Sequence, residues 1–134
     1  MGKPIPLILN LFLILLMVNL LSCGLFNSPL IQSESNKVCM VTDKYMGSEQ
    51  IPVSVEGKAY YGCCAGCASK LKENQNNVRF SKDPLTGEEV DKATAYIVHI
   101  TDGSNNVFYF KSKKTYQQYV DNFHGLPMPL RALK

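Results

Sequence analysis

The sequence of 134 residues contains no tryptophan, only two histidines and little net charge. Its formal charge is +3, and the basic residues are spread along the chain apart from a short run at Lys111, Lys113 and Lys114. Such a run is usually a solvated face, so nucleic-acid binding is not expected. No Ser/His/Asp arrangement or carboxylate pair predicts hydrolysis, and no histidine follows Cys67, which excludes c-type haem attachment. An enzyme is therefore not the expected class.

The N-terminal region carries a long apolar run. Residues 5–21 follow a single cation, Lys3, which is the order of the n-region and h-region in a secretory signal. A transmembrane anchor is the alternative, but Pro4 and Pro6 shorten the usable helix and no positive charges flank its end. Residues 1–22 are therefore predicted to be a signal peptide.

The leader ends at Leu20-Leu21-Ser22-Cys23, which resembles a bacterial lipobox. The resemblance implies cleavage before Cys23 and attachment of a diacylglycerol to its sulfur. Several acyl chains anchor a protein durably, because each buried methylene contributes about 0.8 kcal/mol. The expected product is a lipoprotein anchored in a membrane of the bacterial cell envelope and facing the periplasm. Residues 23–36, rich in Ser, Asn, Gln and Pro, are predicted to be a flexible tether.

Residues 37–77 are predicted to form a first unit, in which a β-hairpin precedes a helix. Apolar residues alternate from Ile51 to Val55, Glu56-Gly57 supplies a turn, and residues 58–62 form the return strand. The residues that follow have the pattern of a short amphipathic helix, which fades at about Asn74.

The first unit holds four cysteines, three of them at the junction of strand and helix. Cys63 and Cys67 are four residues apart and Cys64 and Cys67 are three apart, so either pair can share one face of the first helical turn. Unpaired amides at a helix N-terminus favour thiolates. The hairpin can bring Cys39 to the same place.

Cys39, followed after 23 residues by Cys63-x-x-x-Cys67, resembles the TRASH domain, a family linked to heavy-metal trafficking, resistance and sensing, and the related YHS domain. The resemblance implies a treble-clef-type knuckle that binds a soft metal ion through Cys39, Cys63 and Cys67, with Cys64 as a fourth ligand or a spare thiol. Three thiolates suit trigonal Cu(I) and four suit tetrahedral Zn(II), so both ions stay open.

Four other side chains are weaker metal-ligand candidates. Met40 and Met46 would add thioether donors suited to Cu(I), although methionine beside a small core is more often packing. The two histidines are His99 and His124. A lone histidine on a strand is more often a surface or satisfied residue than a ligand.

Residues 78–124 are predicted to repeat the first unit without its thiols. Asp83 opens a stretch that resembles a YHS knuckle with its cysteine replaced, and a second hairpin and an amphipathic helix follow. Aligning the two halves places Lys111 on Cys63 and Thr115 on Cys67. The predicted fold class is α+β, with two knuckle–hairpin–helix units whose hairpins can share one sheet, and a tail at residues 125–134. An unrelated strand–strand–helix segment is the alternative for the second half.

Three functions are compatible with the sequence. The first is a membrane-tethered protein that binds copper or zinc and exchanges it with a donor or acceptor protein. The second is a thiol-disulfide oxidoreductase that uses Cys64 and Cys67, although the longer βαβ framework of a thioredoxin-like fold is not found. The third is an envelope protein stabilised by disulfides among its four downstream cysteines.

The lipobox gives a first testable prediction. Metabolic labelling with a tagged fatty acid is expected to mark the full-length chain and to be lost in Cys23→Ala, because that sulfur would carry the lipid. Equal labelling of both proteins would contradict the assignment.

Overall fold

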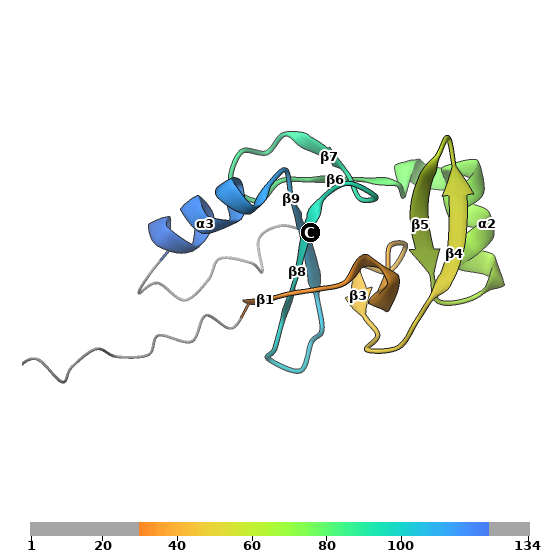
Figure 1. The fold of residues 1–134 in the computed structure, drawn as a ribbon, viewed down its shortest axis with the longest axis horizontal. Helices are drawn as coiled ribbons and strands as arrows, with labels where there is room; N and C mark the ends of the chain where they lie inside the picture. The colour runs from red at the N-terminus through yellow and green to blue at the C-terminus, as the bar shows by residue number, and fades with distance from the viewer. Residues whose placement is uncertain (1–29, 124–134) are drawn as a thin grey trace, which may run out of the picture.

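The computed structural model describes residues 30–123 (Figure 1), so the leader, the predicted lipidation site Cys23, His124 and the tail at residues 125–134 lie outside it. The described chain combines short antiparallel strands with two α-helices, which confirms the predicted α+β class. Within this part of the chain, no helix is long and apolar enough to cross a membrane.

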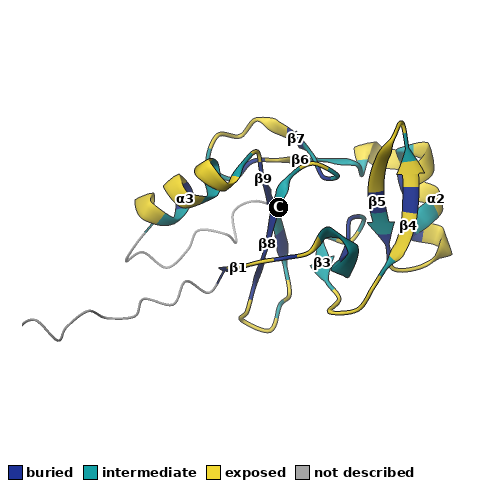
Figure 2. Cartoon of the chain, viewed as in Figure 1, coloured by how far each residue is buried: buried dark blue, intermediate teal, exposed yellow. Residues whose placement is uncertain are grey.

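A three-stranded antiparallel sheet separates two hydrophobic clusters. Its strand order is β1 (Leu30–Gln32), β8 (Tyr96–Ile100) and β9 (Val107–Phe110). Because side chains alternate along a strand, Ile97 joins one cluster whereas Val98 and Ile100 join the other, under helix α3 (Lys113–Asn122). Figure 2 shows the buried stretches on β8 and β9 and the exposed outer surfaces of both helices.

Residues 30–36 differ from the tether predicted for residues 23–36. Strand β1 pairs with β8 in the register Leu30↔Ile100, and Leu30 is buried in the cluster under α3. A 3-10 helix, η1 (Ser35–Lys37), follows directly. The sequence did not predict this strand for two reasons. The segment is polar in composition, and its pairing partner lies far along the chain.

The first unit contains the predicted hairpin and helix. After the short paired strands β2 (Val38–Cys39) and β3 (Lys44–Tyr45), the strands β4 (Ile51–Val55) and β5 (Lys58–Gly62) form a two-stranded antiparallel sheet. Helix α2 (Ala65–Glu73) packs against this hairpin, and its Leu71 is fully buried in the first cluster. A short 3-10 helix, η2 (Gln75–Asn77), leads out of the unit.

The second unit begins with the paired strands β6 (Phe80–Lys82) and β7 (Glu89–Asp91). Asp83 lies in the turn between them and is 1% exposed. Its carboxylate accepts hydrogen bonds from the backbone N–H groups of Leu85, Thr86 and Lys111, at 2.7, 3.2 and 2.7 Å. Asp83 thus ties the turn to the end of β9, just before α3.

The two hairpins do not share one sheet, contrary to the prediction. Strands β4 and β5 pair only with each other within the described chain, whereas β8 pairs with β1 and β9. The hairpins meet instead through the first hydrophobic cluster, which contains Val53 and Tyr60 from one hairpin and Ile97 and Tyr109 from the other. Strand β1 pairs with the edge of β8 that β9 leaves open.

Candidate metal centre

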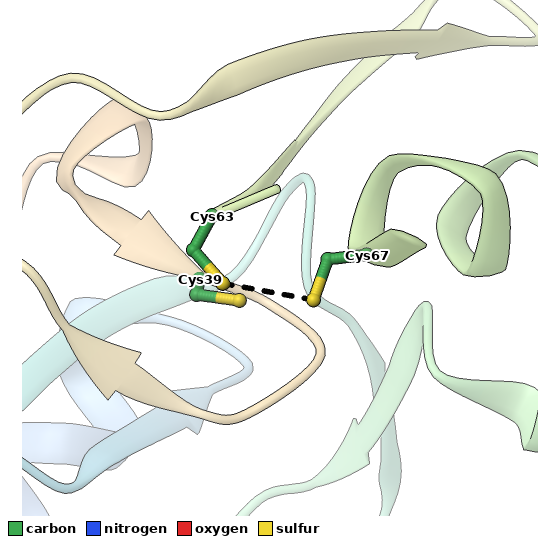
Figure 3. Close-up of side chains that lie close together, drawn as sticks. All are labelled: Cys39, Cys63 and Cys67. Carbon is green, nitrogen blue, oxygen red and sulfur yellow. Dashed lines mark hydrogen bonds between the residues drawn. The ribbon is translucent and has the colours of Figure 1, made fainter. Parts of the chain in front are cut away.

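Three cysteine sulfurs converge where β2, β5 and α2 meet (Figure 3). The Sγ atoms of Cys39, Cys63 and Cys67 all lie within 4.8 Å of one another, and those of Cys63 and Cys67 are 3.6 Å apart. Tetrahedral thiolate ligands 2.3 Å from a zinc ion would be about 3.8 Å apart. The spacing of the sulfurs therefore suits simultaneous contact with one metal ion, whose identity it does not fix.

Cys39 supplies the most deeply buried sulfur of the three. The residue is 0% exposed and ends strand β2. Burial opposes its thiolate, but hydrogen bonds from the Thr42 hydroxyl and from the backbone N–H groups of Thr42, Cys63 and Val41 together lower the pKa of Cys39 to about 7. These N–H groups thus stabilise the thiolate form of the buried Cys39 side chain.

Cys63 and Cys67 approach this sulfur from the strand end and from the helix. Cys63 follows β5 and is exposed, whereas Cys67 lies in the first turn of α2 and is buried. Burial, followed by hydrogen bonds with Cys64 and Cys63, raises the pKa of Cys67 to about 12. The hydrogen bond with Cys39 is the main cause that raises the pKa of Cys63. A metal ion bound here would displace the protons of both thiols.

Cys64 lies outside the group of three sulfurs. It is the N-cap of α2, and its Sγ accepts a hydrogen bond from the backbone N–H of Cys67 at 3.5 Å. The N–H of Cys67 is also the main cause that lowers the pKa of this exposed thiol. Of the two roles predicted for Cys64, the geometry matches the spare thiol, because its sulfur already serves as the helix cap.

The four cysteines of the described chain, Cys39, Cys63, Cys64 and Cys67, are all free thiols. The 3.6 Å between the sulfurs of Cys63 and Cys67 is well beyond a disulfide bond of about 2.05 Å. No disulfide therefore supports the fold of residues 30–123. These residues give no support to the alternative of a disulfide-stabilised protein.

Gly62 allows the helix to approach the strand closely, a role that the sequence did not predict. A Cβ atom at this position would lie 3.0 Å from the backbone N of Ala68 and 3.0 Å from the Cβ of Cys67. Real Cβ atoms rarely lie so close to a neighbour, so a larger residue would push α2 and its thiol outward. A glycine directly before a Cys-rich helix start was the available signal.

The weaker candidates are not part of the sulfur group. Met40 is 0% exposed and packs in the first hydrophobic cluster, whereas Met46 is 46% exposed. His99 stacks on Tyr45, with ring centroids 4.0 Å apart, and its Nδ1 lies 2.8 Å from the hydroxyl of Ser33. Both of these contacts satisfy His99 as a structural residue of β8.

Comparison of the chain with protein-family models, with curated proteins and with solved structures finds no match. The resemblance to TRASH and YHS domains stays a prediction, and functional inference rests on the residues and geometry described above.

The close approach at Gly62 gives a second prediction. Gly62→Ala is expected to lower the free energy of unfolding of the metal-free protein by about 1–3 kcal/mol, because the added methyl group forces α2 away from β5. Urea denaturation followed by circular dichroism measures this change. The matched control is Gly66→Ala, whose Cβ would have its nearest neighbour at 3.9 Å. Equal stability of the two variants would show that α2 does not depend on this contact.

The environment of His99 predicts a loss of stability in acid. Burial lowers the pKa of His99 below its ordinary value of 6.5, so the folded protein binds fewer protons than the unfolded chain. Above pH 6.5, His99 therefore does not change the free energy of unfolding. This free energy falls as the pH drops from 6.5 toward the lower pKa of His99 in the folded protein. His99→Gln, which cannot titrate, is expected to lose less stability than wild type between about pH 7 and pH 5 in urea titrations. Parallel pH profiles for the two proteins would contradict this assignment.

Proposed function

We propose that the protein is a lipid-anchored envelope lipoprotein that binds a soft metal ion through Cys39, Cys63 and Cys67 and serves in metal trafficking, buffering or resistance. The observation that carries the proposal is the convergence of three free sulfurs within 4.8 Å from separate elements of the fold. Cysteine thiolates are preferred ligands of Cu(I) and Zn(II), and cysteine thiols release their protons when a metal binds.

The hydrogen-bonding pattern of the second unit supports a TRASH/YHS-like duplication. Asp83 accepts N–H groups from the residues two and three positions ahead and from Lys111. The pKa of Cys39 is lowered by the N–H groups of the residues two and three positions ahead and by that of Cys63, the counterpart of Lys111 in the alignment. We infer that both turns are one knuckle, with a carboxylate in the second copy where the first has a thiolate.

The helix starts of the two units also correspond. The Ser112 side chain accepts the N–H of Thr115 at 3.2 Å, as the Cys64 sulfur accepts the N–H of Cys67. Since Ser112 and Cys64 are both N-caps, the second unit fits a degenerate copy that retained the cap and lost the thiols.

The number of converging sulfurs favours Cu(I) over Zn(II). Cu(I) is satisfied by three thiolates, whereas a structural zinc site needs a fourth ligand. Zn(II) would have to take that ligand from solvent, from a partner, or from Cys64 after the helix cap is broken. The exposed Cys63 gives a donor or acceptor protein a thiolate from which ligand exchange can start.

A second candidate function is supported by the asymmetry of Cys64 and Cys67. The first thiol is exposed with a lowered pKa, and the second is buried with a pKa raised to about 12. An accessible attacking thiolate beside a buried resolving thiol is the arrangement of disulfide exchange. The proposal of metal binding is preferred because this chemistry leaves the convergence of Cys39 unexplained.

Native mass spectrometry of the anaerobically purified, reduced full-length chain tests the proposed function. One Cu(I) or Zn(II) ion per chain is expected, lost in Cys39→Ser, Cys63→Ser and Cys67→Ser and retained in the matched control Cys64→Ser. Absence of bound metal, together with disulfide reductase turnover that vanishes in Cys64→Ser and survives in Cys39→Ser, would favour the oxidoreductase instead.

A further inference from the structure

Lys92, a buried cation of the second unit, contacts the turn at residues 40–43, which follows Cys39 and is called the knuckle below. Lys92 follows β7 and is 3% exposed, and it is the one lysine or arginine that is buried among residues 30–123. A buried ammonium group is costly unless it is paired and hydrogen-bonded. The groups that pair with the Lys92 ammonium therefore indicate which part of the structure it stabilises.

Both hydrogen-bond partners of the Lys92 ammonium lie in the turn that follows Cys39. Nζ donates to the carbonyl oxygen of Met40 at 2.7 Å and to Oδ1 of Asp43 at 2.6 Å. The same Oδ1 accepts a hydrogen bond from the Tyr109 hydroxyl at 3.0 Å, and Nζ lies 5.0 Å from the centroid of the Tyr109 ring. Lys92 thus bridges the two ends of the stretch that begins with Met40 and ends with Asp43.

This stretch follows Cys39 directly, and its N–H groups at Val41 and Thr42 lower the pKa of Cys39. The donors of Val41 and Thr42 lie between the two residues that Lys92 holds. Asp43 has a positive φ of 52°, which is uncommon for a residue other than glycine. Its carbonyl oxygen accepts the N–H of Val107 at the start of β9, at 3.0 Å. The turn therefore keeps its shape through contacts with the second unit.

We propose that Lys92 is a positioning residue for the Cys39 ligand, so that the thiol-free second unit sets how firmly the first unit holds its metal. This inference rests on the proposed function for its effect on metal, whereas its effect on Cys39 itself does not require metal.

The test measures the alkylation rate of each cysteine in the reduced, metal-free full-length chain, with iodoacetamide and peptide mass spectrometry. Lys92→Met keeps the aliphatic stem and removes the charge and the donors. Because the turn loses two hydrogen bonds from a charged donor, alkylation of Cys39 is expected to be about tenfold faster, whereas the rate at Cys67, which is also buried, stays within about twofold of wild type. Lys92→Arg, which restores a cation with donors, is expected to recover most of the protection of Cys39.

Lys58→Met is the matched control. Lys58 also forms an ion pair with an aspartate of the second unit, Asp91 at 2.7 Å, but its side chain is 46% exposed and the pair does not touch the knuckle. Its removal is expected to change neither rate. Unchanged protection of Cys39 in Lys92→Met, or equal acceleration at Cys39 and Cys67, would overturn the inference, because the second result signals general loss of stability.

Competition with a chromophoric Cu(I) chelator then separates this inference from the proposed function. Lys92→Met is expected to bind Cu(I) about tenfold more weakly than wild type, as is usual when a residue that orients a ligand is removed. If wild type bound neither Cu(I) nor Zn(II) while Lys92→Met still exposed Cys39 selectively, the positioning role would stand and the proposed function would fall. Selective exposure of Cys39 with unchanged metal affinity would overturn the claim that the second unit sets metal binding.

Discussion

The first unit holds the sulfur of Cys39 in a buried position where hydrogen-bond donors favour its anionic form. Cys39 is fully enclosed, and burial is the largest single influence on its pKa. The opposing influence comes from N–H groups that must point inward from one tight turn and from the end of β5. Because those donors act only if the turn keeps its shape, the other contacts of the turn become part of the site. Asp43, with its positive φ, and the buried ammonium of Lys92 both belong to these contacts.

The two halves meet the same requirement with different chemistry. In the proposed second copy, the two carboxylate oxygens of Asp83 accept the three N–H groups, and the turn is complete without a metal. Where the first unit has Gly62 to let the helix approach, the second has the buried Phe110, which packs edge-on against Tyr116 and Tyr119 of α3. Aromatic packing thus takes over the role that converging thiols have in the first unit.

The parts of this structure that the sequence predicted are those encoded by local patterns. Alternation from Ile51 to Val55 and a glycine turn define the first hairpin, and the spacing of Cys63 and Cys67 places both sulfurs at one helical turn. Strand β1, the separate sheets and the role of Lys92 depend on contacts between residues distant in sequence, which carry no periodic signal. The contacts of His99 with Tyr45 and Ser33 likewise join residues that are distant in sequence. The role of Cys64 could not be read from spacing alone, because a residue three positions before Cys67 can either face the same ion or cap the helix.

The three sulfurs differ in burial, so a metal ion bound to them would not lose its three contacts with equal ease. Cys39 precedes Met40, whose carbonyl oxygen is bonded by Lys92 of the second unit, and Cys67 lies in the packed start of α2, whereas Cys63 follows β5 and is exposed. A metal ion shared by such a set loses its contact with the exposed sulfur at the least structural cost, because the two buried sulfurs need the knuckle or the helix to move. In the proposed metal site, Cys63 is therefore the sulfur at which ligand exchange would begin. In the proposed site, the affinity for metal would thus depend mainly on the buried cysteines, and the rate of ligand exchange on Cys63. A substitution that loosens the turn after Cys39 is then expected to change the affinity, and one that alters Cys63 to change the exchange rate.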